Sequence, residues 1–143
     1  MLPEKCFIKG GIRIMDYIKY FKSQAKKFYK DFKTQYTKEN DYIYSYKPKF
    51  WPDIDDIIVS FDIDEDDFSL MKAQHIVAYL ADFDNWNELI HANNYQLEIG
   101  YYLLEHRNNN ALDTWQWYES QLDGIDDFGK LDIFKQVILP TFK

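Results

Sequence analysis

The densest group of side chains that could do chemistry is the acidic run at residues 62–67, which reads Asp-Ile-Asp-Glu-Asp-Asp. Carboxylates at alternate positions are what a hard cation such as Ca²⁺ binds. An EF-hand loop also needs a glycine at its sixth position and a glutamate at its twelfth. This sequence has Asp67 and Ala73 at those positions, so the run does not fit a calcium loop. We expect it to form a solvated loop.

The other residues capable of catalysis or metal binding lack the spacing that such sites need. His75, His91 and His106 form no H-x-x-x-H pair, and the sequence has neither a glycine-rich phosphate loop nor a G-x-S-x-G turn. A lone cysteine, Cys6, excludes an internal disulfide and a cysteine-based zinc site. No acid–base pair stands out among the 24 carboxylates. We therefore expect no catalytic residue, metal or cofactor.

A basic helix is expected from Asp16 to about Tyr36. Its apolar residues recur at steps of three and four and form one stripe, at Ile18, Phe21, Ala25, Phe28 and Phe32. Asp16 fits the N-cap position. The other faces carry six lysines, namely Lys19, Lys22, Lys26, Lys27, Lys30 and Lys33. These lysines either bind a polyanion or simply solvate the helix, and the sequence favours the second interpretation.

A cluster of aromatic residues near the C-terminus suggests a second kind of partner site. On a helix, Trp115 and Tyr118 share a face, whereas Trp117 points elsewhere. Exposed aromatic side chains are enriched at protein interfaces. Trp117 is therefore a candidate contact residue, although packing in the core is the more common fate of such a cluster.

Charge is distributed unevenly along the chain. Residues 1–50 hold 12 Lys/Arg and 5 Asp/Glu, a net charge of +7, whereas residues 51–143 hold 5 and 19, a net charge of −14. This asymmetry indicates either a partner of opposite charge for one half or mutual complementation of the halves within one fold. Complementation is the simpler interpretation.

The remaining elements are expected to be short helices. They follow Asp53, run from Ser69 to Ala81, from Trp86 to about His91, over about 95–107, from a cap at Asp113 to Leu122, and over about 127–138. Alternating tyrosines and two prolines predict an extended segment near 41–50. We thus expect an all-α, single-domain bundle of about five to six helices over residues 15–143, with a basic amphipathic first helix.

Residues 1–14 are expected to lie outside this domain. Two short apolar runs around Gly10-Gly11 could form a hairpin, but an isolated hairpin is marginally stable in water. The alternative is a translated leader ahead of a natural start at Met15. The longest apolar run, residues 76–81, is far shorter than the roughly 20 residues that span a bilayer, and no export signal is evident. We expect a cytoplasmic location.

The stretch from Ala73 to Ile90 resembles a helical module of uncharacterised bacterial proteins. The module has the outline AQ-x-x-x-A-x-x-x-x-GF-x-x-W-x-x-L and also precedes ankyrin-repeat or glyoxalase-like domains. The resemblance implies no catalytic residue, and it places Phe83, Trp86 and Leu89 in the core. The chain departs from the pattern at Asp82, where the module usually has glycine. That position is expected to be the left-handed residue that ends a helix.

Two hypotheses for function follow. The first is a non-enzymatic interaction or regulatory protein, of the antitoxin, immunity-protein or inhibitor type, whose acidic surface binds a basic partner. Its expected contact residues are Asp62, Asp64, Glu65, Asp66, Asp67 and Trp117. The alternative is an adaptor that binds nucleic acid or an anionic membrane through the six lysines of helix 16–36. Because the carboxylates of residues 51–143 repel phosphates, nucleic acid is the less favoured partner.

Overall fold

The computed structural model describes the backbone of residues 6–9, 12–40 and 42–142, and the side chains of residues 16–40 and 42–142. Over these ranges the protein is mostly helical, which confirms the predicted helical class. The chain divides into two compact units. Unit 1 is Met1–Phe21 with Val77–Lys143, and unit 2 is Lys22–Ile76.

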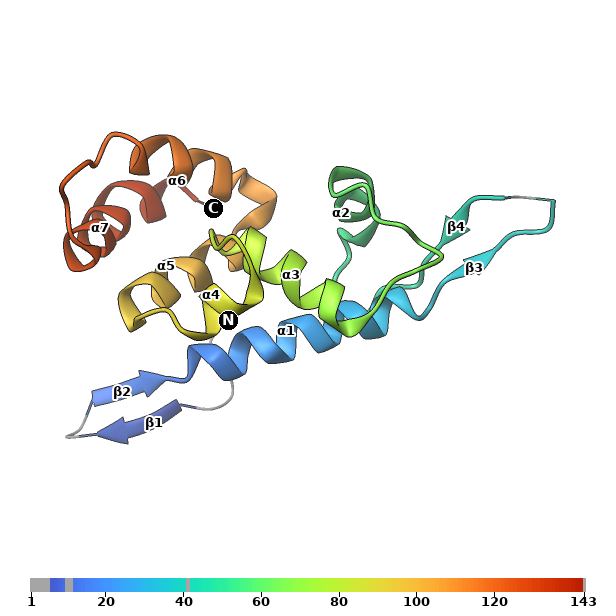
Figure 1. Ribbon diagram of the computed structural model, residues 1–143, viewed down its shortest axis with the longest axis horizontal. Coiled ribbons are helices and arrows are strands. Elements are labelled where there is room, and N and C mark those ends of the chain that lie inside the picture. The colour runs from blue at the N-terminus through green and yellow to red at the C-terminus, as the bar shows by residue number, and fades with distance from the viewer. Residues whose placement is uncertain (1–5, 10–11, 41, 143) are drawn as a thin grey trace. The chain divides into compact units, whose positions relative to one another are not determined.

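Seven α-helices and four short strands occur in the described residues (Figure 1). The count exceeds the expected five to six because each of the seven segments predicted to be helical forms a separate helix. The helices are α1 (Tyr17–Phe32), α2 (Ile54–Ser60), α3 (Leu70–Leu80), α4 (Trp86–Ile90), α5 (Asn94–Glu105), α6 (Ala111–Glu119) and α7 (Asp127–Ile133). The strands β1 (Cys6–Lys9) and β2 (Ile12–Met15) form one antiparallel pair, and β3 (Tyr36–Thr37) and β4 (Tyr44–Ser45) form another.

The first helix forms largely as its pattern predicts. The Asp16 carboxylate caps it by accepting the Lys19 backbone N–H at 3.0 Å. The stripe residues Phe21, Ala25, Phe28 and Phe32 are buried, whereas Ile18 is only half-buried. Helix α1 ends at Phe32 rather than near Tyr36. Within four residues of this end the chain turns into β3, where Tyr36 pairs with Ser45.

A buried carboxylate organises unit 2. Asp31, on α1, is 1% exposed, and its two oxygens accept the backbone N–H groups of Lys49 (2.9 Å), Phe50 (2.8 Å) and Trp51 (2.6 Å). These bonds fix the segment ahead of α2 against α1. As a result the Trp51 ring packs edge-on against Phe28, with 5.0 Å between ring centroids. The apolar stripe gave no hint of this role for Asp31.

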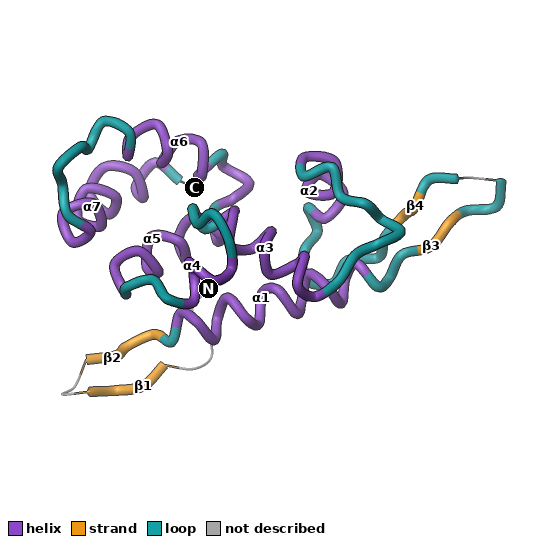
Figure 2. The backbone as a smooth tube through the Cα atoms, in the orientation of Figure 1, coloured by secondary structure: helices purple, strands orange, loops and turns teal. Residues whose placement is uncertain are grey.

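The predicted extended segment is confirmed as a short pair of strands, seen as two orange segments in Figure 2. Thr37 pairs with Tyr44, while Asp41, in the loop that joins the strands, lies outside the described residues. Tyr46 follows β4 and is buried against Phe32, with ring centroids 5.4 Å apart. The loop between α2 and α3 holds the acidic run.

Unit 1 has its own apolar core, built mainly from α5, α6 and the helical segments that follow them. Its buried members are Ile99, Leu103, Ala111, Trp115, Leu131, Phe134, Ile138 and Phe142. Trp115 meets Phe134 edge-on at a centroid distance of 5.1 Å. The spacing of Leu131, Phe134 and Ile138 predicts a shared inner face, and all three are buried, although the chain winds as a π-helix over Phe134–Ile138.

Several predicted helix details need correction. Tyr95, whose spacing along α5 predicts a face shared with Ile99 and Leu103, is 43% exposed, whereas those two residues are buried. Asp113 lies in the first turn of α6 rather than at its cap, which is Asn110. Asp53 occupies the N-cap position of α2 but makes no side-chain capping bond. Ser69 does cap α3, accepting the Lys72 N–H at 3.2 Å.

Residues 6–9 and 12–15 pair as antiparallel strands, in line with the hairpin considered above. Cys6 pairs with Met15 and Lys9 with Ile12. The Gly10-Gly11 turn and the Cys6 side chain lie outside the described residues. The leader hypothesis stays a prediction. No helix in the described ranges is long and apolar enough to cross a membrane.

The three bonds to Asp31 lead to a stability prediction. We expect Asp31→Ala to lower the free energy of unfolding by about 3 kcal/mol or more, because buried N–H groups lose their acceptor. Urea unfolding monitored by tryptophan fluorescence would measure this. Asp56→Ala, which removes an exposed carboxylate from α2 in the same unit, is the matched control. A loss below about 1 kcal/mol for Asp31→Ala would contradict the assigned role.

Candidate functional site

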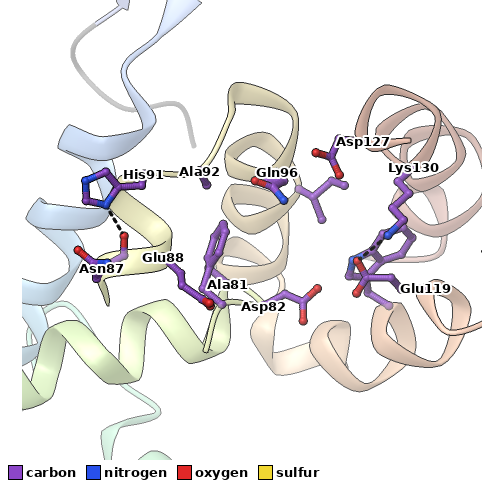
Figure 3. Close-up of a pocket in the computed structure, with 13 residues that line it drawn as sticks. Ala81, Asp82, Asn87, Glu88, His91, Ala92, Gln96, Glu119, Asp127 and Lys130 are labelled. Carbon is purple, nitrogen blue, oxygen red and sulfur yellow. Dashed lines mark hydrogen bonds and ion pairs between the residues drawn. The ribbon is translucent and has the colours of Figure 1, made fainter. Parts of the chain in front are cut away.

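A cavity of about 480 Å³ opens in unit 1 among α4, α5, α6, α7 and the turn that follows α3 (Figure 3). Its volume lies in the range typical of small-ligand sites, about 300–1,000 Å³. The cavity is lined by the apolar side chains of Phe83, Ile99 and Trp115. Its polar and charged lining residues are Asp82, Asn87, Glu88, His91, Gln96, Glu119, Asp127 and Lys130. The mixture of apolar and charged groups distinguishes this cavity from a packing defect in the core.

The turn after α3 places Asp82 at the cavity. The Phe83 N–H donates to the Ala78 carbonyl at 2.9 Å, and the Asp82 N–H donates to the Tyr79 carbonyl at 3.1 Å, a pair of bonds that defines a Schellman helix end. Asp82 itself has φ +70°, in the left-handed region. The predicted left-handed position is thereby confirmed. An L residue there costs about 1–2 kcal/mol relative to glycine.

Close packing of α5 holds this turn in place. A Cβ atom added at Gly100 would lie 3.0 Å from the Ala81 carbonyl oxygen and 3.1 Å from the Ala81 Cβ. Glycine therefore lets α5 approach the backbone directly ahead of Asp82. Of the module residues expected in the core, Leu89 is buried, whereas Phe83 and Trp86 are only half-buried. The turn region is thus part core and part cavity wall.

The Asp82 carboxyl group sits in an environment that favours its neutral form. Burial, and then a hydrogen bond with Glu119, raise the pKa of Asp82 from 3.8 to about 7. The Gln116 side-chain amide donates to Asp82 Oδ1 at 3.1 Å and partly opposes this shift. Near neutral pH a protonated Asp82 can donate to an ionised Glu119. Figure 3 shows the two side chains approaching each other from the turn and from α6.

The other charged groups around the cavity are held by local bonds. Lys130 Nζ lies 3.6 Å from Glu119 Oε2, an ion pair drawn in Figure 3. Asp127 Oδ2 accepts the Asn93 side-chain amide at 2.6 Å. Glu88 Oε2 accepts the backbone N–H of Asp84 at 3.1 Å.

Acidic groups dominate the charge of the cavity. With one proton shared by Asp82 and Glu119, the charges of these two residues, Glu88, Asp127 and Lys130 sum to −2. The arrangement suits a cation, and a carboxyl group that titrates near pH 7 can also take up or release a proton on binding. Among the described side chains, no group of three His, Cys, Asp or Glu residues is arranged to hold a metal ion.

The acidic run 62–67 is only partly the solvated loop that the sequence predicts. Tyr46 donates its hydroxyl proton to Glu65, and Tyr44 donates to Asp66 Oδ1 at 2.5 Å. Asp67 pairs with Lys72 at 3.0 Å. Because their own unit supplies these partners, Glu65, Asp66 and Asp67 stabilise unit 2 as well as carrying charge. The two remaining predicted contact residues of the run, Asp62 and Asp64, are exposed.

Trp117 is 62% exposed, which confirms that one aromatic of the C-terminal cluster faces outward. Its ring meets Tyr118 edge-on with 5.1 Å between centroids, while Trp115 is buried. Trp117 belongs to unit 1 and the acidic run to unit 2. The residues of the predicted acidic surface are therefore divided between the two units.

The six lysines of the first helix differ in their surroundings. Lys33 lies over the Tyr29 ring at 4.4 Å, and Lys27 shares the Phe50 ring with Lys49, each at 5.4 Å. Lys27 is half-buried, whereas the other five are exposed, namely Lys19, Lys22, Lys26, Lys30 and Lys33. Lys19 belongs to unit 1 and the others to unit 2.

Sequence reasoning missed the pairing of Asp82 with Glu119. The departure from glycine at position 82 marked the residue as unusual, but nothing in the sequence indicated its partner on α6. Comparison of this chain with family models, curated proteins and solved structures finds no match.

The raised pKa of Asp82 predicts a pH-dependent effect on stability. Because the folded state holds this proton more tightly than the unfolded state, the contribution of Asp82 is present at low pH and is lost as pH rises toward 7. An asparagine at this position stays neutral throughout. We therefore expect Asp82→Asn to stabilise the protein more at pH 8 than at pH 5, by about 1 kcal/mol or more.

Urea unfolding of both proteins at the two pH values would test this prediction. Asp113→Asn removes an exposed carboxylate from α6 and serves as the control, with the same small effect expected at both pH values. An Asp82→Asn effect that does not change with pH would show that Asp82 is ionised throughout this range.

Proposed function

We propose that this protein is a non-enzymatic interaction protein, of the antitoxin, immunity-protein or inhibitor type, that binds a basic partner through the acidic surface of unit 1. The observation that carries the proposal is the acidic cavity around Asp82. Its carboxylates come from the turn after α3 and from three separate helices, so they face one region rather than being scattered over the unit.

The charge of this part of the chain supports a basic partner. Residues 77–143 hold 4 Lys/Arg and 11 Asp/Glu, a net charge of −7. Two of those basic residues already pair within the unit, Lys130 with Glu119 and Lys135 with Glu98 at 2.6 Å. A field of this sign attracts a basic protein and speeds its association.

Exposed aromatic side chains supply an apolar component for the same surface. Phe128 and Tyr95 are 61% and 43% exposed and meet edge-on with ring centroids 5.5 Å apart. Phe128 directly follows Asp127, which lines the cavity. Aromatic rings beside charged groups are typical of the residues that contribute most to binding energy at interfaces.

A labelled arginine-rich peptide would test this function by fluorescence anisotropy. We expect binding that weakens as salt increases from about 0.05 to 0.5 M, because added salt screens the charges. Glu88→Gln with Asp127→Asn should weaken binding by up to about tenfold, since each exposed charge pair contributes about 0.2–1 kcal/mol.

The matched control is Asp62→Asn with Asp64→Asn, which makes the same change in charge on two exposed residues of unit 2. It should leave the peptide affinity within about twofold, because these two carboxylates do not line the cavity. Equal losses in the two double variants would indicate a diffuse charge effect and not a surface on unit 1. Absence of peptide binding at low salt would also contradict the proposal.

The alternative function, an adaptor for nucleic acid or an anionic membrane, is favoured by one observation. Lysines of unit 2 lie over aromatic rings, including Lys47 over Tyr36 at 5.0 Å, and basic groups interleaved with aromatics suit single-stranded nucleic acid. The numerous carboxylates of the chain weigh against it.

We predict no binding of labelled single- or double-stranded DNA or RNA at about 0.15 M salt, where the Debye length is about 8 Å. Anisotropy measurements would show this directly. Micromolar binding that is abolished by Lys26→Glu with Lys30→Glu would support the adaptor instead, since both lysines are exposed on α1.

A further inference from the structure

We propose that the cavity in unit 1 binds an organic cation, an ammonium or guanidinium group on a carbon chain, which takes the place of the proton that Asp82 shares with Glu119. The inference deepens the proposed function, on which it rests, by naming the chemical group that the acidic surface recognises. The inference also requires that binding of the cation releases a proton.

The cavity has room for such a group and two kinds of wall to receive it. About 480 Å³ is available, more than a single alkylammonium chain needs. Phe83, Ile99 and Trp115 offer apolar surface for the carbon chain. The carboxylates of Asp82 and Glu119 and the side-chain amide of Gln96 offer acceptors for the N–H donors of the cationic head.

The charged side chains that line the cavity favour a positively charged ligand. Lys130 is the basic residue that lines the cavity, and its ammonium already lies 3.6 Å from Glu119. The facing acidic groups come from four elements: Asp82 from the turn after α3, Glu88 from α4, Glu119 from α6 and Asp127 from α7. An anion would meet these carboxylates without a free basic partner, whereas a cation would complete the charge balance.

Proton exchange follows from the chemistry of the carboxyl pair. Before binding, Asp82 and Glu119 together carry one proton and one negative charge, and the pKa of Asp82 is about 7 because of burial and of Glu119. A bound cation stabilises both carboxylates and lowers that pKa, so one proton leaves to solvent. Asp84, Glu88, His91, Asp127 and Lys130 are the other titratable groups near the pair; the Asp84 charge adds to the raised pKa of Asp82, whereas the hydrogen bond from Gln116 opposes it.

Isothermal titration calorimetry of the full chain with n-pentylammonium tests the inference. We expect weak binding, with Kd on the order of 1 mM for so small a ligand. Titrations in buffers of different ionisation enthalpy should show release of about one proton at pH 5.5 and almost none at pH 8.5. Affinity should rise about tenfold per pH unit well below pH 7 and level off above it.

Variants and a neutral probe complete the experiment. Asp82→Asn should abolish proton release and weaken pentylammonium binding at least about tenfold at pH 8. Asp113→Asn, which removes an exposed carboxylate of α6 that does not line the cavity, should change neither the proton release nor the affinity. Urea unfolding confirms that each variant is folded. The neutral analogue n-pentanol should bind at least about tenfold more weakly. Equal binding of pentanol, affinity independent of pH, or normal binding by Asp82→Asn would each overturn the inference.

Competition identifies the source of the cation. If the arginine-rich peptide displaces pentylammonium and also releases a proton, the natural occupant is a side chain of the basic partner. If the peptide binds without displacement while pentylammonium still releases its proton, the cavity serves a free amine. If pentylammonium does not bind, and peptide binding depends on Glu88 and Asp127 but releases no proton, the proposed function stands and this inference alone is defeated.

Discussion

The left-handed turn at Asp82 is the constraint on which the site of unit 1 depends. Helix α3 ends there because Phe83 and Asp82 donate back to the carbonyls of Ala78 and Tyr79, and the residue between the helix and the next segment must take a positive φ. Glycine would meet that demand at lower cost. Aspartate instead brings a carboxyl group to the cavity, where burial and Glu119 favour its protonated form. A locally unfavourable residue at a cavity is a reason to look for function there.

Two carboxylates, the buried Asp31 and the half-buried Asp82, show how the surroundings of a side chain decide whether its role is structural or chemical. Asp31 in unit 2 accepts three backbone N–H groups, so its acceptors are satisfied by the chain itself and its role is to anchor residues 49–51. Asp82 in unit 1 meets one amide donor and a second carboxylate, so its surroundings favour the neutral form. The first arrangement is complete, whereas the second is improved by a bound cation.

Much of the fold could be predicted from the sequence because local signals determine it. The stripe of α1 and the caps at Asp16 and Ser69 follow from spacing and residue type, and the left-handed position at 82 is implied by the resemblance of residues 73–90 to a helical module. The site could not be predicted, because its residues come from five segments brought together by tertiary packing. The same limit applies to the acidic run, whose hydroxyl partners Tyr44 and Tyr46 lie about 20 residues earlier in the chain. Net charge along the sequence indicated an acidic surface but not where its carboxylates would converge.

The most direct test of a cation-binding acidic site is the titration of the Asp82 carboxyl carbon by nuclear magnetic resonance, alone and with the arginine-rich peptide. In the free protein we predict a midpoint near pH 7, well above the ordinary value for aspartate. With saturating peptide the midpoint should move to lower pH, since a cation close to the pair favours its ionised form. A midpoint near pH 4 in the free protein, or one that the peptide leaves unchanged, would contradict a cation-binding role for Asp82.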